Sequence, residues 1–487
     1  MIAMKISRIL CYNIVAALPH FCVGCGFAAT VLVLATPATA QTPWSLQQCC
    51  DYAVEHNIAI RQQQNRCEQQ AIQLSTAKNQ RLPDLSGSAS QNFSFGRGLT
   101  AQNTYTNTNT SSTSFSLGTS VPLFTGFQIP NNIKLNQLNL EAATQDLEKA
   151  KNDIRVQVAQ AYVQILYDME ILDVARRQTT IDSAQVARLQ ALLNNGKVSE
   201  AELAQQKATL AQSLLTVTQA DNNLQLATLA LTQLLELDSP EGFTIERPKT
   251  FPQPLPTGRG VVSSSVDSLN ADCMIEVLED GSIYSPPLEG GVGGGSVYVR
   301  PEIAAEQLRL KATDHSLAIA RAGFYPTLSF SAGLGTNYYT TSGFKSDPFN
   351  KQLKNNFSQY LGLNLNIPIF NRFQTRNSVR SAKIDRLNQQ LTLDNSKKAL
   401  YKEIQQAWYN TVAARRKVES SSEARRASEV AFHMVQTKYE NGKATITEFN
   451  EAKNNYLKTE SDLTQARYEH LYQVALMKFY RGEPLVF

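Results

Sequence analysis

The sequence has few of the residues on which metal sites and disulfide scaffolds depend. Its 487 residues include seven cysteines and five histidines, and three of the cysteines fall within the first 25 residues. The remaining four are too few for a disulfide scaffold, so we expect small, partly buried side chains. They are Cys49, Cys50, Cys67 and Cys273. The histidines, at positions 20, 56, 315, 433 and 470, show no spacing typical of metal ligands.

Sequence motifs of enzymes are also missing. There is no Gly-x-Ser-x-Gly elbow of a hydrolase. The glycines of "GVGGG", residues 291–295, are followed by no Lys-Ser/Thr pair and lack the strand-to-helix context of a phosphate loop. We therefore expect no enzyme activity, no catalytic residues, no metal and no cofactor.

Charge of one sign and long apolar runs are scarce as well. The formal net charge is +4, and no basic stripe marks a nucleic-acid-binding surface. Beyond the N-terminal leader, no run of about 20 apolar residues predicts a membrane helix. Nucleic-acid binding and an all-helical membrane domain are thus disfavoured.

The first 40 residues have the layout of a secretory signal peptide. Lys5 and Arg8 precede an apolar run over residues 23–34, and "ATPATA" ends in Ala38-Thr39-Ala40, a small-x-small cleavage site. We expect export and a mature start near residue 41. An uncleaved anchor is the alternative, because Pro19 and His20 interrupt the leader. The leader cysteines lack the context of a lipoprotein site.

The chain repeats itself after 246 residues. "VPLFTGF" begins at Val121 and "IPIFNRF" at Ile367, and the two copies then stay in register for more than 70 positions. Each copy predicts a helix, a β-hairpin and a helical hairpin. The first copy spans 41–237, with its β-hairpin at about 84–124 and its helical hairpin at about 126–237. The second spans 300–487, with corresponding segments at about 327–370 and 371–481. A Pro/Gly-rich linker, 238–299, separates them, and its low-complexity part, about 258–298, is expected to be mobile.

The predicted strands alternate strictly between apolar and small polar residues. Phe115, Leu117 and Val121, for example, alternate with Ser114 and Ser116. About 10 residues of such alternation are typical of a strand that crosses an outer membrane. A half-buried sheet in water is the alternative. Four strands cannot close a barrel, and open edges in lipid are costly, so a membrane barrel would have to be shared between chains.

The segments 131–194 and 375–440 predict very long helices, because they contain good helix formers and no proline. Apolar residues spaced by seven indicate left-handed coiled-coil packing; they include Ile133, Leu140, Leu147, Ile154 and Ala161. Each helix would be on the order of 100 Å long. Two glycines predict the helix ends, Gly196 and Gly442. Three capping boxes predict helix starts at Ser45/Gln48, Ser199/Glu202 and Thr445/Glu448, and Pro301 predicts a further start.

The order of these features resembles the TolC-like outer membrane efflux protein family, the outer membrane factors of tripartite efflux and type I secretion systems. The features are the leader, "VPLF" and "IPIF" with Pro122 and Pro368 near the strand ends, "RPEI" opening the second copy, and the tip "YENGKATITEFNEA". The resemblance implies an α+β membrane protein and a homotrimer. Its twelve strands, four from each chain, would form one transmembrane β-barrel that continues into a periplasmic α-helical coiled-coil barrel.

The resemblance also implies partners and a role. The protein would be a passive exit duct in the outer membrane that receives substrates from a periplasmic adaptor and an inner membrane pump of the RND, ABC or MFS type. The helical tips would dock on the adaptor; these residues are Asn195, Gly196, Lys197, Asn441, Gly442 and Lys443. Two rivals stay open on the residues alone: a stand-alone diffusion pore, and a soluble periplasmic coiled-coil adaptor or scaffold protein.

The family's periplasmic gate would map onto Glu448, Glu451, Tyr439 and Glu202. Glu202 and Glu448 have a plainer explanation, because each completes a capping box. Glu451 lies one turn further and has no capping role. The family often has an arginine at the position of Ala444, so the ion pair that this arginine makes in the closed state is in doubt here.

Overall fold

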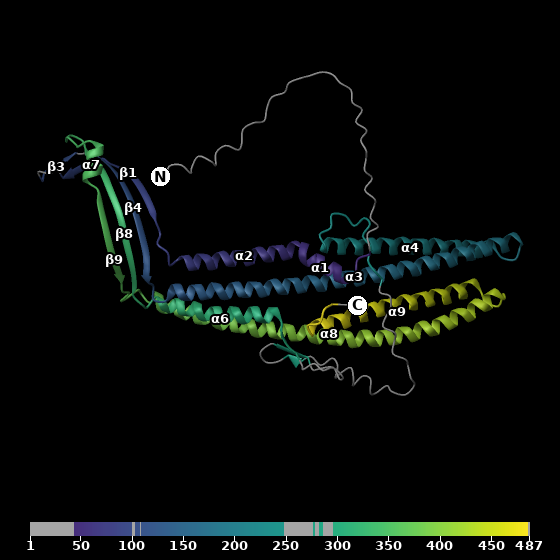
Figure 1. The fold of residues 1–487 in the computed structure, drawn as a ribbon. Helices are drawn as coiled ribbons and strands as arrows, with labels where there is room; N and C mark the ends of the chain where they lie inside the picture. The colour runs from purple at the N-terminus through teal and green to yellow at the C-terminus, as the bar shows by residue number, and fades with distance from the viewer. Residues whose placement is uncertain are drawn as a thin grey trace, which may run out of the picture. The chain divides into compact units, whose positions relative to one another are not determined.

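The computed structural model describes residues 43–99, 103–107, 109–247, 276–277, 282–285 and 296–485. The predicted signal peptide, Cys273 and most of the predicted insertion at about 258–298 lie outside these residues. The described chain has four long strands in one antiparallel sheet and a set of helices that run away from it (Figure 1).

The first described residues lead into two consecutive helices, α1 (Leu46–His56) and α2 (Ile58–Asn79). The predicted capping box at the start of α1 is confirmed, because Ser45 and Gln48 exchange both hydrogen bonds. Asn57 separates the two helices and caps the second, since its side chain accepts a hydrogen bond from the Ala59 N–H at 2.9 Å.

The four-stranded sheet has the order β1 (Ser86–Ser94), β4 (Thr110–Phe124), β8 (Thr327–Thr341) and β9 (Ser358–Asn366). Its register aligns the alternation of all four strands. Leu117 lies opposite Leu334, and Phe330 lies between Val121 and Leu363. One face is therefore mainly apolar, whereas the other carries mainly Ser, Gly and Asn. No residue of these four strands is charged.

The polar face is held by short hydroxyl contacts. The Ser88 and Ser116 hydroxyls lie 2.8 Å apart, and those of Ser90 and Ser114 lie 2.7 Å apart. On the apolar face, large side chains of β4, β8 and β9 are exposed in the single chain; they include Phe115, Leu117, Leu334, Leu361, Leu363 and Leu365. Nothing within the described chain covers the outer edges of β1 and β9.

Short elements lie between the paired strands of both predicted β-hairpins. Between β1 and β4 lies a small hairpin of β2 (Arg97–Leu99) and β3 (Tyr105–Asn107), and between β8 and β9 lies α7 (Phe349–Asn355). Part of the predicted mobile insertion forms a three-stranded sheet, β5 (Glu276–Val277), β6 (Ser282–Ser285) and β7 (Ser296–Val299). Such brief strands are too short to show a period of two in the sequence.

The predicted long helices are confirmed. α3 (Gln128–Asn194) and α8 (Gln374–Glu440) each have 67 residues, and α4 (Glu200–Leu234) and α9 (Ile446–Tyr480) each have 35. α4 returns along α3 and α9 along α8, with both turns at the end away from the sheet (Figure 1). The predicted start at Pro301 is also confirmed, because α6 (Pro301–Ala322) has this proline in its first turn.

Both junctions from strand to long helix use left-handed residues. Gly126 and Phe127 have φ of +61° and +67°, and Arg372 and Phe373 have φ of +53° and +62°. Gly126 is required for space as well, since a Cβ there would lie 2.8 Å from the Tyr325 Cβ. The turn stacks each phenylalanine edge-on against the aromatic ring three residues earlier.

The two predicted strand-end prolines occupy different positions. Pro122 lies inside β4, where the pairing with β8 shifts register between Pro122 and Phe124. Pro368 lies two residues beyond the end of β9 at Asn366. A proline has no N–H to donate to the hydrogen bonds between strands. The register shift at Pro122 and the position of Pro368 outside β9 each avoid the loss of such a hydrogen bond.

The largest apolar core among the described residues joins α1, the middle of α3 and the C-terminal ends of α4 and α9. Cys49 and Cys50 lie in it and are buried more completely than expected. Burial raises the pKa of each of these thiols to about 12. The Tyr162 hydroxyl, also in this core, donates to the Glu246 carbonyl at 2.7 Å. Across the described residues, no helix has the length and apolar character needed to cross a bilayer.

Candidate functional site at the helical hairpin tips

Both hairpin turns close with the same hydrogen-bond pattern. Gly196 N–H donates to Leu193 O at 2.8 Å and Lys197 N–H to Leu192 O at 3.0 Å. In the second hairpin, Gly442 N–H donates to Tyr439 O at 3.0 Å and Lys443 N–H to Lys438 O at 2.8 Å. This is the Schellman motif, and the φ values of +67° and +70° at the glycines confirm the predicted left-handed ends.

The six predicted docking residues are all exposed at these turns. Asn195 and Asn441 donate from their side chains to Ala191 O and Thr437 O, each at 2.8 Å. The hydrogen bonds that close the turns therefore come from the asparagine side chains and from the backbone N–H groups of the glycines and lysines. The side chains of Lys197 and Lys443 take no part in these hydrogen bonds.

The capping prediction is right at one turn and half right at the other. Glu448 N–H donates to Thr445 Oγ1 at 3.2 Å, and Thr445 N–H donates to Glu448 Oε2 at 2.7 Å, which completes a capping box. The hydrogen bond from the Thr445 backbone lowers the pKa of the exposed Glu448 carboxyl. At the other turn, Glu202 N–H donates to Ser199 Oγ at 3.3 Å, but the structure records no full box.

Tyr439 of α8 contacts the first hairpin. The Arg188 guanidinium lies over its ring at 5.5 Å, and its hydroxyl shares a hydrogen bond with Gln185. Burial raises the pKa of Tyr439, and the nearby Glu202 carboxylate acts in the same direction. Of the predicted gate residues, Tyr439 therefore contacts the first hairpin through Arg188. Glu448 and Glu451 are exposed on α9.

An apolar cluster lies directly behind the turns and contains one or more residues from each of the four helix ends. Its buried members are Leu189, Leu203, Phe432, Ile446 and Phe449. The Tyr439 ring stacks on Phe449 at 5.0 Å, and Phe432 stacks on Tyr456 at 5.6 Å. The two tips of one chain are therefore packed on each other.

A buried ion pair links the hairpins one or two turns further from the tips. The Lys453 ammonium of α9 contacts the Asp182 carboxylate of α3, and both side chains are essentially inaccessible to solvent. Gln178 donates to Asp182 Oδ2 at 2.7 Å, and Gln206 of α4 donates to Asp182 Oδ1 at 3.3 Å. Asn450 of α9 donates to Gln206 Oε1 at 3.0 Å.

Sequence reasoning missed this pair completely. Asp182 and Lys453 are 271 residues apart, and each stands on a helix rich in polar residues. A charged residue is rarely buried unless it is paired. Their burial follows only from the register of α3 against α9, which no local pattern encodes.

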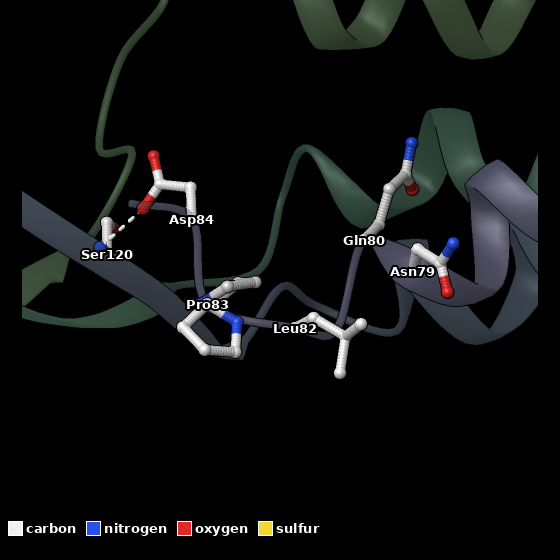
Figure 2. Close-up of a pocket in the computed structure, with 7 residues that line it drawn as sticks. Asn79, Gln80, Leu82, Pro83, Asp84 and Ser120 are labelled. Atoms are coloured by element: carbon white, nitrogen blue, oxygen red, sulfur yellow. Dashed lines mark hydrogen bonds between the residues drawn. The ribbon is translucent and has the colours of Figure 1, made fainter. Parts of the chain in front are cut away.

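A surface hollow outside the tips lies where α2 leads into β1 (Figure 2). Pro83 and Pro122 line it, and the Asp84 carboxylate there accepts a hydrogen bond from the Ser120 N–H. The carboxylate serves the β1–β4 contact, and no second titratable group lines the hollow. This place therefore offers no catalytic chemistry.

The comparisons with known proteins agree with the features of the fold. The model of the outer membrane efflux protein family matches residues 50–236 and 299–480. Outer membrane efflux protein BepC of Brucella suis biovar 1 is 20% identical over 444 residues, which are 91% of this chain and 86% of BepC. Pyoverdine export outer membrane protein OpmQ of Pseudomonas putida is 22% identical over 308 residues, 63% of this chain and 57% of OpmQ.

The fold is similar to that of solved outer membrane channels. The structure of VceC from Vibrio cholerae covers 91% of this chain and 97% of its own at 17% identity, with a TM-score of 0.68. The strands, the long helices and the hairpin tips therefore have counterparts in a TolC-like channel fold. Because the family model matches most of the chain on both sides of the linker, the chain belongs to the outer membrane efflux protein family and is a transport protein of the outer membrane with a large periplasmic helical portion.

Proposed function

We propose that three copies of this chain form the passive exit duct of a tripartite efflux or type I secretion system. The observation that carries the trimer is the sheet. Its large apolar side chains lie mainly on one face and its small polar ones mainly on the other, and its two outer edges are unpaired within the described chain. Three such sheets joined edge to edge give twelve strands without an open edge in lipid.

The matched lengths of the helices support a helical tunnel built from two similar units. The long helices are equal in length in both halves of the chain, as are the return helices. This equality supports an internal duplication with copies at 41–237 and 300–487, separated by the linker 238–299. In a trimer, six hairpins of equal reach would form one periplasmic tube.

The polar face of the sheet favours a barrel lumen that does not itself select cargo by charge. With no charged residue on the four strands, the barrel lumen would present hydroxyl and amide groups to both anions and cations. Energy and most substrate selection would then come from an inner membrane pump, of the RND, ABC or MFS type, and a periplasmic adaptor. Lys197, Lys443 and their neighbouring Asn and Gly residues are the proposed adaptor contacts.

The acidic residues at the tips are proposed to form the periplasmic gate. Glu448 and Glu451 would be repeated threefold in a trimer and would favour cations at a constriction. Tyr439 would hold the second hairpin against the first, as its contact with Arg188 supports, and Glu202 would add a further carboxylate at this level.

The test of this function combines assembly and transport. The outer membrane fraction is extracted in detergent, treated with and without a crosslinker, and its mass measured. We expect a trimer. Deleting the turn 194–199 should abolish export while the trimer still assembles, with a strain lacking the whole gene as control. A monomer in detergent, or full export without the tip, would contradict the proposal.

A further inference from the structure

We propose that the end of the four-stranded sheet away from the helices carries a binding site for a phosphorylated glycolipid of the outer leaflet of the outer membrane. The site is a hollow across β1, β4 and β8, bordered by aromatic rings and by the lysines between β8 and β9. The hollow belongs to one chain. Its position at the level of lipid headgroups rests on the proposed barrel, because only a sheet that crosses the bilayer brings it there.

The hollow, called the outer hollow below, lies where β4 begins and β8 ends. The helices leave the sheet at the other end (Figure 1), so with periplasmic helices this end points outward. Its volume is about 380 Å³, within the range of pockets that hold small molecules. Three aromatic rings line it together with a set of hydroxyl groups. The rings belong to Phe93, Phe95 and Phe344, and the hydroxyls include those of Ser111 and Thr340.

The strand register relates the outer hollow to the apolar face of the sheet. Phe93 pairs with Ser111, and Ser111 pairs with Thr340. Ser111 shares its face of β4 with Phe115 and Leu117, because residues two apart along a strand point the same way. Along this face, large apolar side chains therefore give way to hydroxyls and aromatic rings. Such a change is typical of the boundary between the apolar band of a barrel and the headgroup region.

The helix α7 is held firmly beside this boundary. The Gln352 side chain accepts from the Tyr339 N–H at 2.9 Å and donates to the Tyr339 carbonyl at 3.0 Å. The Phe349 ring of α7 packs edge-on against Tyr338 at 5.1 Å. The lysines of α7 are therefore presented on a fixed support at the outer end of the sheet.

The charges of the sheet and of its outward connections gather at this end. Between residues 86 and 124 and between 327 and 366, the sequence has four basic residues and one acidic residue; they are Arg97, Lys345, Lys351, Lys354 and Asp347. The acidic residue is already used, because Asp347 contacts Lys351 at 3.0 Å. Lys345 is exposed and stands between Phe344 and Ser346, which both line the outer hollow. The rim therefore has a positive excess that favours an anionic ligand.

A phosphorylated sugar headgroup matches all of these groups at once. Aromatic faces pack on the C–H groups of a sugar ring, the serine and threonine hydroxyls exchange hydrogen bonds with its hydroxyls, and lysines attract its phosphates. The acyl chains would lie along the exposed leucines of the same face, among them Leu117, Leu334 and Leu361. Free phosphate would gain only the lysines, and a phospholipid would offer no sugar ring to the aromatic side chains.

The experiment uses the full chain in detergent and measures binding of diphosphorylated lipid A by native mass spectrometry. Lipid A should bind about tenfold or more tightly than phosphatidylglycerol. Lys345→Gln combined with Lys354→Gln should weaken lipid A binding by about tenfold, because two charges that attract the phosphates are lost. Phe95→Ser should weaken it by about threefold or more. The Phe95 ring is 76% exposed, so this change should leave the fold intact.

A matched control lies at the opposite end of the sheet. Arg376 lies over the Phe373 ring at 5.9 Å, as Arg97 lies over the Tyr105 ring at 5.9 Å in the outward connection. Arg376→Gln should leave lipid A binding within about twofold of the native chain, because screening limits the reach of a charge to about 10 Å. An equal loss in this control, or phosphatidylglycerol binding as tight as that of lipid A, would overturn the site.

A chelator separates direct contact from a bridge through a divalent cation. The one carboxylate at this end, Asp347, is paired with Lys351, so we expect the lysines to contact the phosphates directly. Lipid A should then bind at least as tightly without Mg²⁺ as with it, since Mg²⁺ competes for the phosphates. A requirement for Mg²⁺ would overturn the proposed contact.

The same spectra separate failure of the site from failure of the duct. A trimer whose lipid A binding is unchanged by the lysine and Phe95 variants would overturn the site and leave the duct supported. A monomer that binds lipid A with the expected dependence on these variants would overturn the duct and support the site. If a neighbouring chain fills the outer hollow instead, Phe95→Ser should weaken the trimer but not lipid A binding, and this result would also overturn the site.

Discussion

Asp168 is a buried carboxyl whose recorded side-chain partner is the Gln164 amide on the same helix, at 3.1 Å. Burial raises the pKa of this carboxyl, so the folded state binds its proton more tightly than the unfolded state does. The group then favours folding at low pH, and this contribution is lost as the pH rises through the raised pKa.

Replacing Asp168 by Asn should therefore stabilise the protein at neutral pH. The amide keeps a hydrogen-bond acceptor for Gln164 and has no charge to bury. We expect a gain below about 1 kcal/mol at pH 7, since water screens part of the effect, and no gain below the raised pKa. Denaturant unfolding at pH 4 and pH 7 measures it; a loss of stability at pH 7 would contradict the assignment.

Glu448 and Glu451 allow capping to be separated from gating. Glu448→Gln should keep the capping box, because a glutamine side chain can also accept from the Thr445 N–H, whereas Glu448→Ala should lose it. Hydrogen exchange at the first turn of α9 should rise only in the alanine variant. Because the pKa of Glu448 is lowered in the folded protein, the ionised side chain stabilises the start of α9 at high pH. This stabilisation is lost as the pH falls through the lowered pKa.

A gating role predicts a different pattern from the same variants. Glu448→Gln and Glu451→Gln should both reduce cation selectivity in planar bilayers, because each removes a ring of three negative charges in a trimer. The reversal potential in a salt gradient measures this selectivity. Unchanged selectivity in Glu451→Gln would leave its carboxylate without a role in the gate.

At the level of elements, the two strand-to-helix junctions differ in their first left-handed residue. Gly126 and Arg372 occupy equivalent places, and both have a positive φ. Gly126→Ala should destabilise the protein by roughly 1–2 kcal/mol for the left-handed backbone alone, with a further cost from the contact with Tyr325. Arg372→Gly should be neutral or stabilising. Thermal unfolding of the two variants gives the comparison, and equal losses would contradict this explanation.

The elements that the sequence predicted well are those with a long period or a strict local code. The 67-residue helices follow from the absence of proline and from sevenfold apolar spacing, and the turns follow from Gly196 and Gly442. The sequence did not predict that β9 ends before Pro368, and it did not predict five short strands, β2, β3, β5, β6 and β7. These short strands depend on tertiary pairing, because two to four residues are too few to show a sequence pattern.

The candidate site was predicted unevenly for the same reason. Turn and cap residues have signatures within four positions, so the Thr445 box and the Schellman turns were foreseeable. The proximity of Tyr439 to Arg188 and Gln185, and the Asp182–Lys453 pair, depend on how one hairpin packs against the other. Such contacts join residues more than 250 positions apart and leave no local trace.

At the level of the whole molecule, the two faces of the sheet make a sharp prediction about the membrane. Leu363 lies on the apolar face and its neighbour Asn364 on the polar face. In the proposed barrel, Leu363→Lys should destabilise the protein by roughly 2–4 kcal/mol near the bilayer midplane, whereas Asn364→Lys should be tolerated. The amount of each variant in the outer membrane measures both effects; equal effects would mean that the two faces do not contact different solvents.

The equal helix lengths restrict how such a chain can change its reach. A deletion of seven residues in α3 between the sheet and Asp182 would leave the first hairpin turn closer to the sheet than the second. It would also separate Asp182 from Lys453. The return helix α4 would also be left seven residues too long for its partner. During evolution, the helical hairpins can therefore change length only through four matched insertions or deletions, one in each of α3, α4, α8 and α9. We expect natural length variation to be confined to the loops and the linker.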